Sequence, residues 1–190
     1  MKPLLVIGAS SFGQLIRALA EDAGLHVAGF IDDIHDGPDI LGDRAALGTR
    51  LAPGDYDLAM AIGYSHLPAR LALYHECTSK GFDFPPIVHP RAHINPRARL
   101  GAGCIVMASA NIDAFSKVEP LCVLWPAAVV SHDCNVRTNT FISPNATLCG
   151  FAEIGHSSFI GAGSVVVNGS RVPENGFVKA GSRYVGKSGE

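Results

Sequence analysis

Ile-Gly-His-Ser-Ser-Phe-Ile-Gly-Ala-Gly-Ser, residues 154–164, contains two successive copies of the pattern that decides the fold of this chain. In each copy an aliphatic residue comes first and a small residue follows four positions later. The aliphatic residue recurs at every sixth position, without a break, at Val88, Ile94, Leu100, Val106, Ile112, Val118, Leu124, Val130, Val136, Ile142, Leu148, Ile154, Ile160, Val166, Val172 and Val178. The small residues that follow all but the last of these are Ala92, Ala98, Cys104, Ala110, Ser116, Cys122, Ala128, Cys134, Thr140, Ala146, Ala152, Ser158, Ser164, Ser170 and Gly176.

This strict period excludes the commonest regular structures. An α-helix turns about every 3.6 residues, so an apolar stripe of period six would wander around its surface. Hairpin sheets place turn signals about every 8–12 residues and do not keep one unbroken register. A short unbroken period is typical of repeat proteins, in which each unit buries its apolar residue only by stacking on its neighbours.

The pattern resembles the hexapeptide repeat of left-handed parallel β-helices. In that fold three hexapeptides form one triangular coil, so the chain returns to the same edge every 18 residues. The fifteen intervals between Val88 and Val178 then predict about five coils. We expect the aliphatic residues inside the prism, the small residues at its corners, and coils stacked at a strand spacing of about 4.8 Å.

Residues 1–84 show a different pattern, typical of a small α/β domain. Short apolar runs at 4–7, 26–31 and 56–62 predict buried parallel strands, and apolar residues at helical spacing predict helices at 15–23 and 67–80. This is a half-Rossmann βαβαβ unit. Pro85-Pro86 marks the junction. We therefore expect a nucleotide-sugar-binding domain at 1–84 and a catalytic β-helix domain that binds acetyl-CoA at 85–190.

The carboxyl ends of the predicted strands carry the candidate substrate-binding residues. A glycine loop at 8–13 opens the first helix, where backbone N–H groups face an anion. Because Ser10 replaces the middle glycine of a dinucleotide loop and the unit has only three predicted strands, a nucleotide-sugar is the better ligand. The alternatives are a tight turn without a ligand and an Asp32 that only caps the next turn. The candidates are Gly8, Ser10, Ser11, Asp32, Asp33 and Gly63.

Composition and cysteine usage exclude several classes of protein. The formal net charge of −2 provides no basic field for nucleic acid, and no apolar run approaches the ~20 residues of a membrane span. Cys104, Cys122 and Cys134 occupy the small position of the repeat, while Cys77 and Cys149 lie outside it. We therefore expect no disulfide, no metal site, no nucleic-acid or membrane partner, and a cytoplasmic protein.

The whole chain resembles the bacterial sugar O-/N-acyltransferases of the NeuD/PglD type. Some of these enzymes acetylate the 4-amino group of a UDP- or dTDP-linked deoxysugar, and others acetylate a sialic-acid hydroxyl. The most specific element is Val129-Val130-Ser131-His132-Asp133-Cys134. The other motifs that carry the resemblance are residues 7–13, 29–33, 61–63, 87–90, 142–150 and 154–164.

The resemblance implies the chemistry of the site. His132 matches the general base, Asp133 the acid that orients it, and Gly150 the glycine whose N–H polarises the thioester of acetyl-CoA. His132 and Gly150 are the third residues of hexapeptides 18 residues apart, so one should lie directly above the other. The family also implies a homotrimer with acetyl-CoA between subunits. The most probable reaction class is N-acetylation of a nucleotide-linked 4-amino-deoxysugar.

Some positions depart from the family pattern. Phe141 stands nine residues after the base, where many members carry a second histidine, and residues 10–12 replace the usual Gly-Gly-His of the loop. Two alternatives therefore stay open: a sugar O-acetyltransferase of the sialic-acid type, and a non-catalytic β-helix scaffold. Arg171 and Lys179 either bind the CoA phosphates or are simply solvated. The candidate cofactor-binding residues are Phe141, Gly150, Ala162, Arg171 and Lys179.

Overall fold

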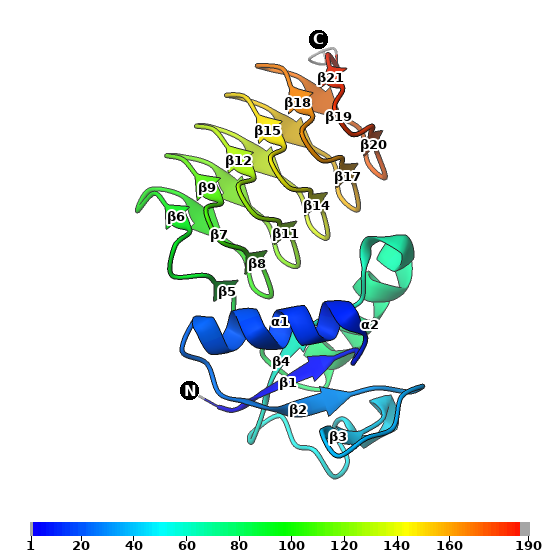
Figure 1. Cartoon of the computed structure of the whole chain (residues 1–190). Coiled ribbons are helices and arrows are strands. Elements are labelled where there is room, and N and C mark those ends of the chain that lie inside the picture. The colour runs from blue at the N-terminus through cyan, green and yellow to red at the C-terminus, as the bar shows by residue number, and fades with distance from the viewer. Residues whose placement is uncertain (1, 187–190) are drawn as a thin grey trace. The chain divides into compact units, whose positions relative to one another are not determined.

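The computed structural model describes residues 2–186, which form two compact units that divide between Ile87 and Val88 (Figure 1). The first is a small α/β unit and the second a β-solenoid of about five turns. The predicted half-Rossmann unit followed by a left-handed parallel β-helix is thus confirmed.

The N-terminal unit is a four-stranded parallel sheet with the strand order β3-β2-β1-β4. Its central strands are buried because each is a continuous apolar run, as expected when helices cover a parallel sheet. The elements, in chain order, are β1 (Leu4–Ile7), α1 (Ser11–Asp22), β2 (Val27–Ile31), β3 (Ile40–Gly42), a 3₁₀ turn (Arg44–Ala46), β4 (Asp57–Met60), a second 3₁₀ turn (Tyr64–His66) and α2 (Leu67–Ser79).

Strand β3 was not predicted, and in the described residues a 3₁₀ turn rather than an α-helix lies between β2 and β4. Strand β3 has three residues, all only partly buried, so it leaves no apolar run to detect. It forms because Phe30 and Ile31 of β2 offer it a free edge with parallel pairing. The predicted order of strands and helices is otherwise that of the structure.

In residues 87–186 the chain forms seventeen two-residue strands, which stack into three parallel sheets (Figure 1). Sheet I contains β5 (Ile87–Val88), β8 (Ile105–Val106), β11 (Val123–Leu124), β14 (Phe141–Ile142), β17 (Phe159–Ile160) and β20 (Phe177–Val178). Sheet II contains β6 (His93–Ile94), β9 (Asn111–Ile112), β12 (Val129–Val130), β15 (Thr147–Leu148), β18 (Val165–Val166) and β21 (Arg183–Tyr184). Sheet III contains β7 (Arg99–Leu100), β10 (Lys117–Val118), β13 (Asn135–Val136), β16 (Glu153–Ile154) and β19 (Arg171–Val172).

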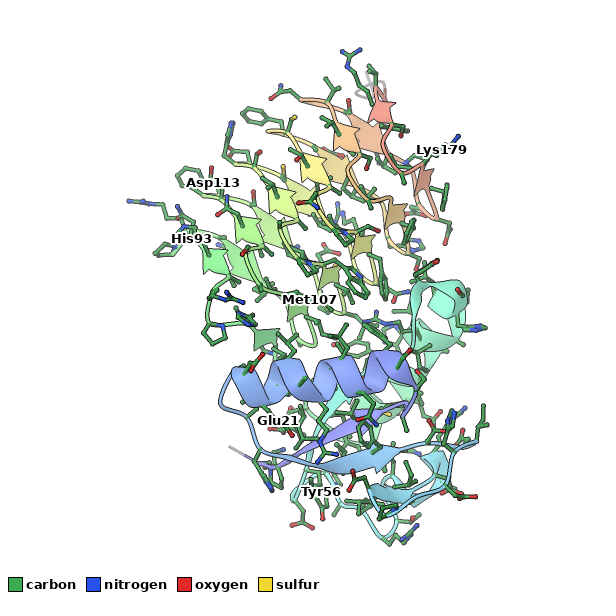
Figure 2. The ribbon with its side chains drawn as sticks, viewed as in Figure 1. Glu21, Tyr56, His93, Met107, Asp113 and Lys179 are labelled. Carbon is green, nitrogen blue, oxygen red and sulfur yellow. The ribbon has the colours of Figure 1, made fainter. Side chains whose placement is uncertain are left out.

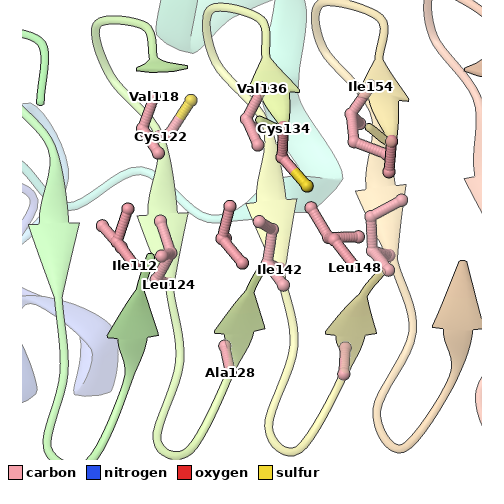
Figure 3. Packing of buried hydrophobic residues seen from close by; sticks show 14 of the residues in the cluster. Ile112, Val118, Cys122, Leu124, Ala128, Cys134, Val136, Ile142, Leu148 and Ile154 are labelled. Atoms are coloured by element: carbon pink, nitrogen blue, oxygen red, sulfur yellow. The ribbon is translucent and has the colours of Figure 1, made fainter. Parts of the chain in front are cut away.

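The interior of the β-helix is the predicted aliphatic column. Each predicted aliphatic residue is the second residue of a strand, and those from Val106 to Val178 are at most 1% exposed. Figure 3 shows these side chains meeting in the prism interior, with Leu124 and Ile142 on successive coils. Tyr184 continues the register one repeat beyond Val178 and packs partly buried on the same core.

The corners of the coils depend on residues with a positive φ. These stand at every sixth position from Gly103 to Gly181, each immediately before a small residue, and ten of them are not glycine. Serine and cysteine at the small position also donate hydrogen bonds to the next coil, as from Cys122 Sγ to the Arg137 carbonyl at 3.2 Å. The corner cysteines therefore act as weak donors as well as small apolar residues.

Candidate active site

His132 lies at the corner between sheets II and III, in the turn that joins β12 to β13. Its Nδ1 is 3.0 Å from Oδ2 of Asp133. Asp133 is the corner residue with φ 57°, a conformation that aspartate tolerates better than most residues. The carboxylate favours the proton on Nδ1, which leaves Nε2 as the basic atom of the ring. Both side chains are only partly exposed, at 49% and 39%.

Gly150 lies against the imidazole of His132, one coil further along. A Cβ at Gly150 would come within 2.7 Å of both Cε1 and Nε2 of His132 and within 3.1 Å of Oδ1 of Asn168. Strands β12 and β15 pair Val130 with Leu148, which sets this registration. The structure therefore brings His132 and Gly150 together as the period predicted. In residues 2–186 the Gly150 N–H donates no hydrogen bond to the protein, so it can meet an external acceptor.

Two further side chains reach this corner that the period alone did not single out. The ring of Phe151 makes an edge contact with His132, with centroids 5.1 Å apart and an interplanar angle of 88°. Asn168 follows Gly150 by one coil and approaches it from the other side. Their shared spacing of 18 or 19 residues from His132 and Gly150 was the available signal.

Cys149 is the thiol nearest to this corner in sequence, directly before Gly150. It is partly buried, whereas the other four cysteines are buried. Burial raises the pKa of the Cys134 thiol to about 11, so a thiolate is disfavoured there at neutral pH. No disulfide forms among the five cysteines in the described structure.

The remaining candidate cofactor residues lie on other faces of the chain. Phe141 is fully buried on β14 of sheet I, which does not border the His132 corner. Ala162 and Lys179 follow β17 and β20 at the corner between sheets I and II, and both are exposed (Figure 2). Arg171 is exposed on β19 of sheet III, with Nε 3.7 Å from Oε2 of Glu153. One chain therefore does not gather these residues around His132.

The glycine loop of the N-terminal unit is held by its backbone. Gly8 has φ 102°, and a Cβ on Gly13 would lie 1.9 Å from the Gly8 carbonyl oxygen, so both positions require glycine. Ser10 is the N-cap of α1, and Ser10 and Ser11 are exposed at its N-terminus. Gly63 precedes the 3₁₀ turn after β4 and is not crowded. These residues share the carboxyl edge of the parallel sheet with Asp32 and Asp33.

Asp32 caps the turn that follows β2. Its Oδ2 accepts from the Ala9 N–H at 2.6 Å, and its Oδ1 accepts from the Ile34 and His35 N–H groups, each at 2.8 Å. Burial raises the pKa of Asp32, but the hydrogen bonds outweigh it and lower the pKa to about 2. The carboxylate thus ties the glycine loop to the next turn.

A polar pocket of about 480 Å³ opens beside Asp32. Asp33, Asp43 and Arg50 are among its lining residues. Asp33 accepts a hydrogen bond from the Arg44 N–H at 2.8 Å, and the Arg50 guanidinium packs over Gly42. The pocket presents both carboxylates and a guanidinium, which suits hydrogen bonding to a base or ribose.

Residues 2–186 contain no helix with the length and apolar character needed to cross a bilayer. In the same residues no group of three or more His, Cys, Asp or Glu side chains is placed to hold a metal ion.

Comparison with known proteins assigns the family. The PglD N-terminal domain family matches residues 3–75. The acetyltransferase domain of PglB from Neisseria gonorrhoeae is 30% identical, with a TM-score of 0.93, covering 100% of this chain and 94% of that one. The chain belongs to the PglD-type sugar acyltransferases.

Two solved structures of the family hold ligands. The same PglB domain in complex with acetyl coenzyme A is 30% identical with a TM-score of 0.90, covering 98% of this chain and 94% of that one. PerB from Caulobacter crescentus, in complex with CoA and GDP-perosamine, is 28% identical with a TM-score of 0.91, covering 98% and 90%. These relatives of the hexapeptide type are CoA-dependent sugar N-acetyltransferases.

Proposed function

We propose that this chain is an acetyl-CoA-dependent N-acetyltransferase that acts on the 4-amino group of a nucleotide-linked deoxysugar in surface-glycan synthesis. The observation that carries the proposal is the His132 imidazole, oriented by Asp133 and resting against Gly150, whose N–H is available. Membership of the family, and relatives crystallised with acetyl-CoA, CoA and GDP-perosamine, support it.

The geometry suits direct transfer from acetyl-CoA. The acceptor amine attacks the thioester carbonyl carbon while Nε2 of His132 takes a proton from the amine. The Gly150 N–H donates to the carbonyl oxygen as negative charge develops on it. The carbon–sulfur bond then breaks, and the imidazolium returns the proton to the CoA sulfur. Asp133 keeps the ring in the correct tautomer and stabilises its charged form.

The acceptor nucleotide is proposed to bind at the carboxyl edge of the N-terminal sheet. The loop from Gly8 to Ser11 and the N-terminus of α1 would meet its phosphates, and Asp33 and Gly63 would lie beside its nucleoside. Asp32 would contribute by holding the loop, because its carboxylate already accepts hydrogen bonds from the protein. We propose UDP or dTDP as the carrier, and PerB adds GDP to the nucleotides that need testing.

We further propose a cytoplasmic homotrimer with acetyl-CoA in the groove between subunits. Ala162, Arg171 and Lys179 lie on faces away from the His132 corner of their own chain. A neighbouring subunit would bring such residues to that corner, where the two cations would meet the CoA phosphates. Phe141 would pack beneath the groove without a polar contact, because it is fully buried.

The test is thiol release from acetyl-CoA with UDP-, dTDP- and GDP-linked 4-amino-deoxysugars and with sialic acids. We expect turnover on a 4-amino sugar, lowered on the order of 10²-fold or more in His132→Ala. Cys149→Ala is the matched control and keeps full activity, since the mechanism has no acyl-enzyme. Turnover on sialic acid alone would favour O-acetylation. No turnover together with no CoA binding by calorimetry would leave a scaffold and overturn the proposal.

A further inference from the structure

Two exposed phenylalanines stand at corner positions with positive φ. Phe115 is 64% exposed with φ 63°, and Phe151 is 55% exposed with φ 60°. Bulky side chains rarely adopt this conformation, and such outliers cluster at functional sites. Both fall at the corner between sheets II and III, one coil on either side of Asp133. The bulky exposed corner residues therefore bracket the residues of the proposed active site.

Phe151 contacts the imidazole of His132 directly. The near-perpendicular rings, 5.1 Å apart, are in the edge-to-face arrangement that aromatic pairs prefer. The ring of His132 is then supported on three sides: by Asp133 at Nδ1, by the backbone of Gly150 beside Cε1 and Nε2, and by Phe151. Without such support a half-exposed side chain would sample several rotamers.

The corner backbone does not itself require an aromatic residue. The equivalent positions elsewhere in the described coils hold glycine, asparagine or serine, among others, at similar φ. Phenylalanine is less favourable than any of these in the left-handed region, and more than half of its surface faces solvent. Neither the backbone nor core packing therefore explains Phe151, whereas its contact with His132 does.

We propose that Phe151 is a positioning residue, whose ring holds the His132 imidazole in the rotamer that directs Nδ1 to Asp133 and keeps Nε2 against Gly150. The inference rests on the proposed function in taking His132 as the base. It adds a residue that acts through His132.

The experiment compares Phe151→Gly with Phe115→Gly. Glycine suits a positive φ, so both variants should keep the fold, and each removes one exposed ring. Phe115 is the matched control because no ring contact joins it to His132 in the described structure. Phe151→Tyr keeps the ring and serves as the conservative variant.

The first measurement is the NMR spectrum of the His132 ring in the free protein, assigned by its loss in His132→Asn. We expect Phe151→Gly to move the His132 ring-proton resonances and to bring the Nδ1 and Nε2 nitrogen shifts closer together, as tautomers and rotamers average. Phe115→Gly and Phe151→Tyr should leave both unchanged. Unchanged His132 resonances in Phe151→Gly would overturn the proposal.

The second measurement is the steady-state rate with the acceptor found in the panel. Phe151→Gly should lower kcat about 3- to 10-fold with KM values within about twofold, and Phe151→Tyr should restore it. A raised acceptor KM with unchanged kcat and unchanged His132 resonances would make Phe151 an acceptor contact and refute positioning. If no acceptor turns over, the proposed function fails, but the resonances still decide the role of Phe151.

Discussion

Replacing Gly150 with alanine should separate catalysis from stability in this protein. The new Cβ would lie 2.7 Å from Cε1 and Nε2 of His132, whereas ordinary contact begins near 3.4 Å, so the imidazole must move by about 0.7 Å. Misplacing a catalytic group by about 1 Å can cost about 100-fold in rate. We therefore expect kcat to fall about 10- to 100-fold.

Stability should change little. The φ of Gly150 is not in the left-handed region, and Ala114 occupies the same corner position two coils earlier, so the backbone accepts a Cβ. Alanine in place of glycine adds about 0.4–1 kcal/mol of stability through the unfolded state. An off-rotamer His132 costs about 0.5–1.5 kcal/mol, so the net change should stay within about 1 kcal/mol.

The assay pairs thiol release with urea unfolding. His132→Ala and the double variant with Gly150→Ala should have the same low activity, because the clash acts through His132. Adding Asn168→Ala to Gly150→Ala removes the other close contact and should not restore the rate. A Gly150→Ala enzyme with kcat within twofold of wild type, or one destabilised by more than about 3 kcal/mol, would refute the reasoning.

Three further predictions concern stability and reactivity. The pKa of Asp32 is lowered to about 2, so its contribution of about 2 kcal/mol is present above pH 4 and is lost as pH falls toward 2; urea unfolding should show wild type more stable than Asp32→Asn at pH 7, and a persistent gap at pH 2 would contradict this. Ile142 is fully buried in the prism, so Ile142→Ala should cost about 2–5 kcal/mol in urea and Ile142→Val about 0.5–1.5; a cost below 1 kcal/mol for alanine would show that the coils relax around the cavity. A thiol reagent at pH 8 should label the native protein only at Cys149, because the other cysteines are buried; labelling that survives in Cys149→Ala would show that the coils open.

The fold of the β-helix followed from the sequence because its rule is local. One aliphatic residue every six positions can be buried in only one way, and residues 18 apart must then stack. The same arithmetic placed Gly150 against His132 before any coordinate was known, and the structure agrees. The N-terminal strands β1, β2 and β4 were equally accessible, because continuous apolar runs next to glycine predict buried parallel strands.

Other features depended on long-range packing that a period does not contain. Strand β3 forms only because β2 leaves an edge for it. The Asp32 carboxylate could have faced a ribose or its own chain with equal reason, and it turns to the Ala9 N–H because the loop after β1 passes beside it.

What the sequence determined by itself was the coil, its buried column and the corner that carries His132. What the tertiary structure decided was the direction of side chains at that corner, where Phe151 meets His132, and the separation of Phe141, Ala162, Arg171 and Lys179 onto other faces. The physical reason is that periodicity fixes the backbone, whereas rotamers at left-handed corners depend on neighbours one coil away.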